Sequence, residues 1–145
     1  MKDWSTDPRP GYLVNRASRL YRNYSHSRLT SIGLAEGQVP VIMSLSDGLA
    51  ENQRNLARAA GVEQPTMAQT LARMERDGLI ERSPDPEDGR SSLVRLTPLA
   101  KASFPTVLRT LESANEQALL GFSDDEIQSF TGLLKRVISN LEKED

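Results

Sequence analysis

The sequence contains no cysteine, and this absence removes several classes of function. Among 145 residues there are zero Cys and one His, so disulfides, thiolate zinc sites and thiol-based redox sensing are excluded. A single imidazole, that of His26, cannot form the multi-histidine site usual for zinc. We therefore expect neither a metal nor a cofactor.

Aromatic residues and long apolar runs are also scarce. Only 37% of residues are hydrophobic and 5% aromatic, so the core is expected to be aliphatic and to need a partner subunit for its completion. No apolar run approaches the length of a membrane span, and the first residues carry no secretory signal. We expect a soluble, cytoplasmic protein with no membrane partner, folded as a single domain over residues 1–145.

A general excess of positive charge is missing as well. The net charge is −2 and argues against non-specific nucleic-acid binding, which normally goes with a basic surface. The cations are unevenly placed, however, because the first 35 residues are rich in Arg and residues 101–145 are rich in acids. Between Asp3 and Ala100 every cation is Arg, which suits bidentate recognition of phosphate and bases. A locally positive surface is therefore compatible with an acidic chain.

The sequence also lacks the residue sets of common enzymes. There is no Cys-His pair, no Ser-His-Asp set around the single histidine, and no Gly-rich phosphate loop. The acidic run Asp124-Asp125-Glu126 is explained by favourable charge at a helix start. We expect that the protein is not an enzyme.

The segment from residue 53 to 97 is the most informative part of the chain. Its periodicity predicts a short helix, Gln53 to Ala60, followed by a tight turn at Gly61 and an inward-pointing Val62. A second helix opens with Glu63-Gln64-Pro65-Thr66, since Pro is favoured in a first turn. Its predicted buried stripe is Met67, Leu71 and Met74.

The outward face of that second helix carries side chains that can read bases. Amides pair with adenine, Arg pairs with guanine, and small residues allow close approach to a thymine methyl group. The simpler alternative is that these residues are only a solvated helix face. The outward residues are Gln64, Thr66, Ala68, Gln69, Thr70 and Arg73.

A hairpin is predicted after this helix. Asp77-Gly78 predicts a left-handed helix end, a strand begins at Leu79, and Ser92 to Thr97 alternates apolar and polar residues as its partner strand. Arg90, at the tip, suits the narrow minor groove of DNA, although an ordinary hairpin charge is the alternative. We expect Asp88 to orient the Arg90 guanidinium.

A helix-turn-helix followed by a two-stranded wing is a shape that docks on duplex DNA. Arg54 and Arg58 lie on the first helix of this unit. They either contact DNA phosphates or only keep the surface of that helix solvated. The predicted DNA-binding residues are Arg54, Gln64, Pro65, Thr66, Ala68, Gln69, Arg73, Asp88 and Arg90.

Further helices are expected on either side of this unit. An arm over residues 1–10 precedes a helix from Tyr12 to Leu29, and a third helix spans Glu36 to Leu45 with Pro40 in its first turn. Thr97-Pro98 starts a helix to about Leu120 that Pro105 should kink. Ser123 to Glu126 is a capping box for a last helix, whose apolar stripe is Ile127, Phe130, Leu134, Val137 and Leu141.

The end helices have little of their own domain to cover their apolar stripes. We therefore expect residues 1–33 and 98–145 to form a two-fold dimer interface around a DNA-binding unit at 36–97. Dimerisation would place two reading helices about 34 Å, or roughly 10 base pairs, apart. The partner is then double-stranded DNA with a pseudo-palindromic operator.

A small-molecule site is predicted between the dimer helices and the reading unit. Arg16, Tyr24 and His26 would line it, because a cation beside aromatic rings suits a phenolic carboxylate. The alternative is that Tyr24 packs in the interface, Arg16 pairs with an acid and His26 is exposed, as such residues usually are.

The run from Gly61 to Ile80, followed by Asp88-Gly89-Arg90 and Val94-Arg95-Leu96-Thr97, resembles the MarR family of bacterial transcriptional regulators, and within it the SlyA-like members. The resemblance covers nearly the whole chain. It implies a mainly α protein with a small two- or three-stranded β wing, a winged helix-turn-helix with N- and C-terminal dimerisation helices. The absence of Cys excludes the family branch that senses peroxides through a thiol. Glu87 and Gly89 stand where many relatives have Arg or Lys.

The resemblance implies a homodimeric, sequence-specific regulator that often responds to small anionic or aromatic ligands, and we expect a repressor. The alternative is a winged-helix module that binds a basic protein partner and has no specific DNA binding.

Overall fold

The computed structural model describes residues 9–143, which form a mainly helical fold with one small sheet. The fold class expected from the sequence is confirmed, with three strands in the wing region. The predicted arm over residues 1–10 lies outside the described residues, except for Arg9 and Pro10. The elements are α1 (Pro10–Ser31), the 3-10 turn η2 (Glu36–Gln38), α2 (Val39–Ser44), β1 (Glu51–Asn52), α3 (Gln53–Ala60), α4 (Gln64–Arg76), β2 (Ile80–Pro84), β3 (Ser92–Leu96), α5 (Pro98–Ala118) and α6 (Asp124–Glu142).

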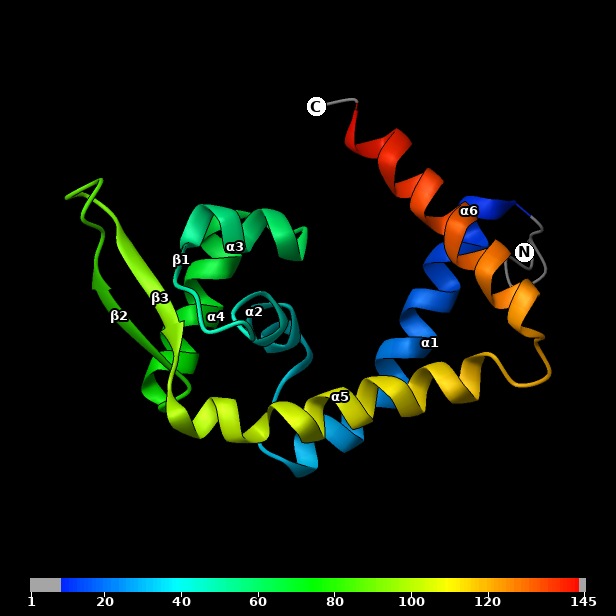
Figure 1. Ribbon diagram of the computed structural model, residues 1–145, viewed down its shortest axis with the longest axis horizontal. Helices are drawn as coiled ribbons and strands as arrows, with labels where there is room; N and C mark the ends of the chain where they lie inside the picture. The colour runs from blue at the N-terminus through cyan, green and yellow to red at the C-terminus, as the bar shows by residue number, and fades with distance from the viewer. Residues whose placement is uncertain (1–8, 144–145) are drawn as a thin grey trace, which may run out of the picture.

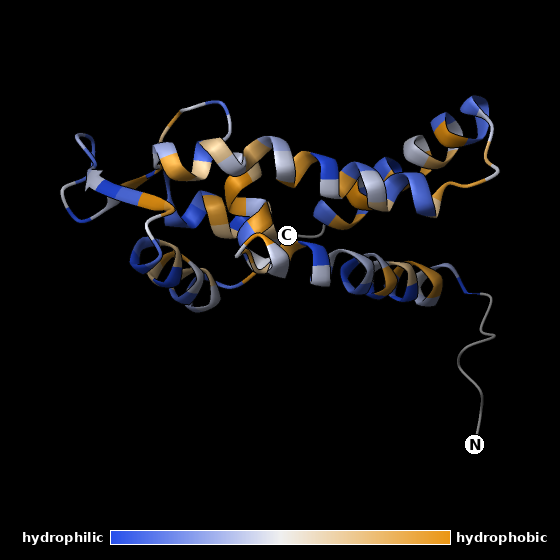
Figure 2. Cartoon of the chain, turned by 90° about the horizontal axis from the view of Figure 1, so that it is seen from below, coloured by the Kyte–Doolittle hydropathy of each residue, from blue (hydrophilic) through white to orange (hydrophobic). Residues whose placement is uncertain are grey.

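The elements form two groups joined by the long helix α5. Helices α3 and α4 and the β2–β3 hairpin lie at one end of α5, whereas α1 and α6 lie towards the other (Figure 1). Bands of hydrophobic and hydrophilic colour alternate along the helices in Figure 2, as expected for amphipathic helices that each cover one side of a core.

The helix-turn-helix forms as predicted from its end signals. The Asn52 side chain accepts a hydrogen bond from the backbone N–H of Asn55 at 2.9 Å and so caps α3. Helix α3 ends at Gly61, whose φ of +67° is left-handed. The predicted orientation of Val62 is wrong, because its side chain is 38% exposed. Its backbone N–H turns back to the carbonyl of Ala57 at 3.1 Å, and this completes the turn without burying the side chain.

The core of the reading unit lies between α4, the sheet and the first part of α5. The predicted stripe of Met67, Leu71 and Met74 is buried, with exposed fractions of 0–1%. The sheet order is β1-β3-β2, and all pairings are antiparallel. Val94 and Leu96 of β3 are also buried, so the central strand is the one that ties the wing to the core.

The short helix before the reading unit differs from its predicted extent. Residues 36–38 form the 3-10 turn η2, and α2 starts only at Val39, with Pro40 in its first turn. This start follows from the ring of Pro40, which is tolerated only where no intrahelical N–H is required. Pro40 therefore lies in the first turn, as the sequence predicts, because the helix is shorter than expected.

The two C-terminal helices begin at the predicted caps. The Thr97 hydroxyl accepts from the N–H of Ala100 at 3.3 Å, and α5 continues past Pro105 as one helix (Figure 1). Ser123 and Glu126 form the capping box of α6, with bonds of 3.0 and 3.2 Å. No residue of α6 is buried. Of its predicted stripe, Ile127 and Leu134 are half-buried and Phe130, Val137 and Leu141 are exposed, so the rest of the described chain leaves most of the stripe uncovered.

Candidate nucleic-acid interface

A polar groove separates α3 from the wing. It has a volume of about 700 Å³ and combines side chains from the starts of α3 and α4 with side chains from the hairpin tip. The elements that carry these side chains, α3 and the β2–β3 hairpin, are both drawn in Figure 1, where the hairpin extends beside α3. The lining residues are Asn52, Gln53, Arg54, Asn55, Arg58, Gln64, Asp85, Glu87, Asp88, Arg90, Ser91 and Ser92.

The α3 wall supplies two cations at helical spacing. Arg54 and Arg58 are four residues apart, so they lie on one face of α3, and both line the groove. Neither guanidinium group has an ion-pair partner within residues 9–143. Arg58 was not in the predicted DNA-binding set; its spacing puts it on the face of Arg54, but only the position of the wing shows that both line one groove.

The reading helix is held against α3 and presents its polar face outward. Gln53 of α3 donates from Nε2 to the backbone carbonyl of Gln64 at 3.3 Å. Among the predicted base-reading residues, only Gln64 lines the groove itself. Of the others, Pro65, Thr66, Gln69 and Arg73 are exposed, whereas Ala68 and Thr70 are half-buried. The predicted outward position of Thr70 is corrected, because its hydroxyl faces Gly37 of the 3-10 turn.

The wing tip is organised by two short carboxylate contacts. Asp85 Oδ1 accepts from the backbone N–H of Glu87 at 2.9 Å, and Asp88 Oδ1 accepts from the backbone N–H of Arg90 at 3.0 Å. The predicted role of Asp88 is therefore corrected, because its carboxylate binds the Arg90 backbone and not the guanidinium. An Asp carboxylate commonly bonds to an N–H two residues ahead in this way. The Arg90 side chain itself is exposed.

The groove contains acids as well as cations. Asp85, Glu87 and Asp88 line it together with three Arg side chains. The carboxylates of Asp85 and Asp88 are used by the turn, whereas the Glu87 carboxylate has no hydrogen-bond or ion-pair partner in the part of the chain that the structure describes. The arrangement supplies exposed cations for phosphate contact while the tip remains locally acidic.

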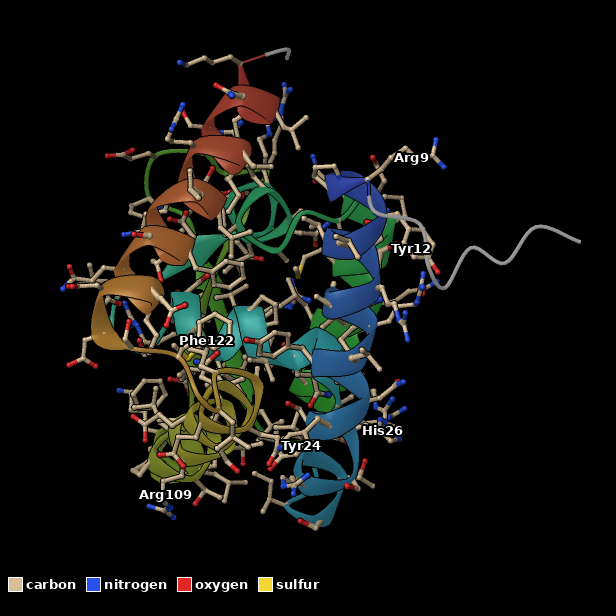
Figure 3. All side chains as sticks on the ribbon, turned by 90° about the vertical axis from the view of Figure 1, so that its right-hand side faces the viewer. Arg9, Tyr12, Tyr24, His26, Arg109 and Phe122 are labelled. Carbon is tan, nitrogen blue, oxygen red and sulfur yellow. The ribbon has the colours of Figure 1, made fainter. Side chains whose placement is uncertain are left out.

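The residues of the predicted effector site are not brought together. The Tyr24 hydroxyl lies 3.2 Å from Ser113 Oγ of α5, and the Arg28 guanidinium lies 3.8 Å above the Tyr24 ring. The His26 side chain is 71% exposed and lies 3.9 Å from a carboxylate oxygen of Glu36. Figure 3 shows Tyr24 and His26 pointing to different sides of α1.

Two apolar pockets nevertheless lie between α1 and the elements packed on it. Each has a volume of about 420 Å³, and Tyr21 and Ala114 line both. Tyr24 lines the first, whereas neither Arg16 nor His26 lines either pocket. Sequence reasoning missed the small and aliphatic residues that form these walls, because they are ordinary helix-packing positions. The first is lined by Ala17, Leu20, Tyr21, Tyr24, Ala114, Gln117 and Ala118.

Comparison with known proteins supports the winged-helix assignment. The MarR family model matches residues 34–92. The curated protein described as an uncharacterized HTH-type transcriptional regulator, YybA of Bacillus subtilis, is 25% identical over 131 residues, which cover 90% of this chain and 87% of that protein. A probable transcriptional regulator from Pseudomonas aeruginosa is 30% identical in its crystal structure, with a TM-score of 0.80, over 90% of this chain and 98% of that one.

A third relative was crystallised with a ligand. The PcaV transcriptional regulator from Streptomyces coelicolor, in complex with its natural ligand, is 27% identical over 96% of both chains, with a TM-score of 0.81. The crystal structure of the transcriptional regulator SlyA has a TM-score of 0.84 at 23% identity, which is a likeness of fold.

Within residues 9–143, no helix has the length and apolar character needed to cross a membrane.

Proposed function

The chain belongs to the MarR family of transcriptional regulators, and we propose that it is a homodimeric repressor that binds a pseudo-palindromic operator. Members of this family are regulators and not enzymes. Because the target is chromosomal DNA, the proposed place of action is the bacterial cytoplasm.

The observation that carries the proposal is the groove between α3 and the wing beside the polar face of α4. Arg54, Arg58 and Arg90 converge on this groove, so one strand of the DNA backbone would lie along it. Gln69 and Arg73 on the outer side of α4 would then face base edges in the major groove. Arg90 would reach the adjacent minor groove.

Homodimerisation is supported by the exposed apolar side chains at the ends of the chain. Phe130, Leu133, Val137, Ile138 and Leu141 of α6 are 40–68% exposed. Leu13, Val14 and Leu20 of α1 are 42–56% exposed, and α1 and α6 lie at the same end of the molecule (Figure 1). A two-fold axis through these helices would cover both sets at once.

A ligand response is the finer part of the proposal. We place a small anionic or aromatic effector in the apolar pockets between α1 and α5. This replaces the site of Arg16, Tyr24 and His26 expected from the sequence by one that retains only Tyr24. A ligand there would release DNA to the extent that it prefers a spacing of the two reading helices that does not fit the operator.

Selection of duplexes from a random library, followed by gel shift, tests this function. The expected result is one enriched sequence with two inverted half-sites about 10 base pairs apart, centre to centre. Enrichment of no sequence, together with retention of a basic protein, would instead support the alternative of a winged-helix protein-interaction module.

A further inference from the structure

One ion pair joins the wing to the reading helix. Arg82 Nε of β2 lies 3.4 Å from Glu75 Oε2, in the last turn of α4, and the Arg82 side chain is only 28% exposed. A second pair lies beside it, Arg76 Nε with Asp77 Oδ1 at 3.5 Å, but that pair joins neighbouring residues. It therefore cannot fix one element relative to another.

The position of Arg82 follows from strand geometry. Alternate residues of a strand share a face, so Arg82 lies on the same face as Ile80, which is 2% exposed and belongs to the core. Its partner in the β2–β3 register is Val94, which is completely buried. Glu81, Ser83 and Pro84 of β2 are exposed, so the hydrophobic core holds the wing only up to the level of Arg82 and Val94.

The connection from α4 to the wing is fixed at one point. Gly78 has a φ of +75°, its carbonyl accepts from the Thr97 hydroxyl at 2.6 Å, and the Leu79 carbonyl accepts from the Thr97 N–H at 3.1 Å. These bonds set where the hairpin starts. The pairing of β1 with Leu93 and Val94 also holds the central strand. Beyond that level no backbone pairing in the described chain ties the hairpin to another element, so its tilt towards or away from α4 is not set by these bonds alone.

We propose that the Glu75–Arg82 pair sets this tilt and thereby places Arg90 for its contact with DNA. Both residues are positioning residues, and neither lines the groove. The DNA part of this inference rests on the proposed function. The restraint on the wing is a property of the free protein and can be measured without DNA.

Glu75→Gln is the decisive variant, because the effect of a displaced wing on DNA affinity and the effect of the lost negative charge have opposite signs. Loss of a negative charge close to DNA should by itself strengthen binding. Loss of wing tilt should instead weaken it, and we expect a loss of about fivefold, which is the upper range for an exposed pair. Asp77→Asn is the matched control, since it removes the same charge from the same helix end and is expected to bind as tightly as the unchanged protein or more tightly.

Two further measurements locate the effect. In an Arg90→Ala background, Glu75→Gln should no longer weaken binding to the selected duplex, because the residue it positions is gone, and should act as Asp77→Asn does in the same background. Exchange of Glu75 and Arg82, as Glu75→Arg with Arg82→Glu, should restore affinity. An additive loss in the Arg90→Ala background, or tighter binding by Glu75→Gln itself, would overturn the proposal.

Amide hydrogen exchange of the free protein tests the same inference independently of DNA. Glu75→Gln and Arg82→Met should both speed exchange over residues 82–92, whereas Asp77→Asn should not. Equal wing exchange in all three variants would overturn the inference even if the protein binds its operator. Faster exchange in the first two, in a protein that selects no duplex, would support the wing restraint and refute the proposed function.

Discussion

At the scale of single residues, the wing tip combines an exposed cation with acids that shape its loop. The carboxylates of Asp85 and Asp88 accept backbone N–H groups of Glu87 and Arg90, so they order the turn without pairing with the guanidinium. The N–H groups of the Arg90 guanidinium are therefore available to another partner. A chain with a net charge of −2 can in this way present cations locally where phosphate is to be bound.

Substitution Arg90→Ala should weaken binding to all duplexes by a similar factor. Loss of one cation in the phosphate region reduces the magnitude of the slope of log K against log salt by about one unit. Gel shift or fluorescence anisotropy over a salt series measures this slope. Arg109→Ala, which removes an exposed Arg of α5 that lies outside the groove, is the control and should leave the slope unchanged. Equal slopes for Arg90→Ala and the unchanged protein would refute the contact.

Substitution Gln69→Ala should change sequence preference more than general affinity. An exposed amide on the outer side of α4 can pair bidentately with adenine, and its loss relaxes discrimination by roughly 1–3 kcal/mol at one position in each half-site. Repeating the duplex selection with this variant reads the effect directly. An unaltered sequence preference would remove Gln69 from the base-reading set.

Residue roles were predictable from the sequence where periodicity governs them. The buried stripe of α4 and the exposure of Gln69 and Arg73 follow from helical spacing. The role of Asp88 did not follow, because a short side chain can bond either to a nearby guanidinium or to its own backbone, and only the loop conformation decides between them. The sequence could not decide whether Arg58 contacts DNA or is an ordinary surface charge. The structure favours the first, because Arg58 lines the groove opposite the wing.

At the scale of secondary-structure elements, end signals decide where helices start and stop. Helix α6 illustrates this, because Ser123 and Glu126 satisfy each other's backbone N–H groups in a capping box. The backbone hydrogen bond from Ser123, followed by the bond from its side chain, holds the pKa of Glu126 below its ordinary value of 4.5. The charged carboxylate is therefore the form that the folded helix favours.

This capping box gives α6 a stability that depends on pH. A carboxyl group whose pKa is lowered in the folded state stabilises the fold above its ordinary pKa, and this contribution is lost as the pH falls through the folded value. The thermal unfolding temperature of Glu126→Gln should thus approach that of the unchanged protein on acidification below about pH 4.5.

Ser123→Ala should lower the free energy of unfolding by about 1 kcal/mol at neutral pH, because the helix loses its N-cap. Asp125→Asn, also in the first turn but outside the capping box, is the control and should cost less than Ser123→Ala at neutral pH; an equal cost would contradict the account.

Most elements could be predicted because they carry strong local signals. Helix α3 was placed at its observed ends by its apolar face and Gly61. Strand β1 was not identified, because the two residues Glu51 and Asn52 are too few to show alternation, and their pairing with β3 is a tertiary contact. The 3-10 turn before α2 likewise reflects the constraint at Pro40 and not a pattern of its own.

At the scale of the whole molecule, the central feature is α6, a helix of 19 residues without a buried side chain. Its sequence showed an apolar stripe but not what covers it, since a stripe looks the same whether it faces its own core or a partner. The structure removes the first possibility for the described chain. The expected dimer interface over residues 1–33 and 98–145, with a DNA-binding unit at 36–97, remains a prediction.

Substitution Val137→Glu should disrupt the proposed dimer. The Val137 side chain is 42% exposed in a single chain, so the change is tolerated there, whereas burial of an unpaired carboxylate in an interface costs several kcal/mol. Analytical ultracentrifugation should show a dimer dissociation constant at least about tenfold higher, so that monomers persist at tenfold higher protein concentration. Ser139→Glu, on the polar side of the same helix, is the control and should leave the dimer intact. A monomer–dimer equilibrium that Val137→Glu leaves unchanged would remove α6 from the interface.

The mass of the complex with a selected duplex tests the account most directly, because every larger claim depends on two copies gripping one DNA segment. Sedimentation or native mass spectrometry should give two protein chains per duplex carrying two inverted half-sites. A complex of one chain per duplex, or a selected sequence with a single half-site, would contradict the account.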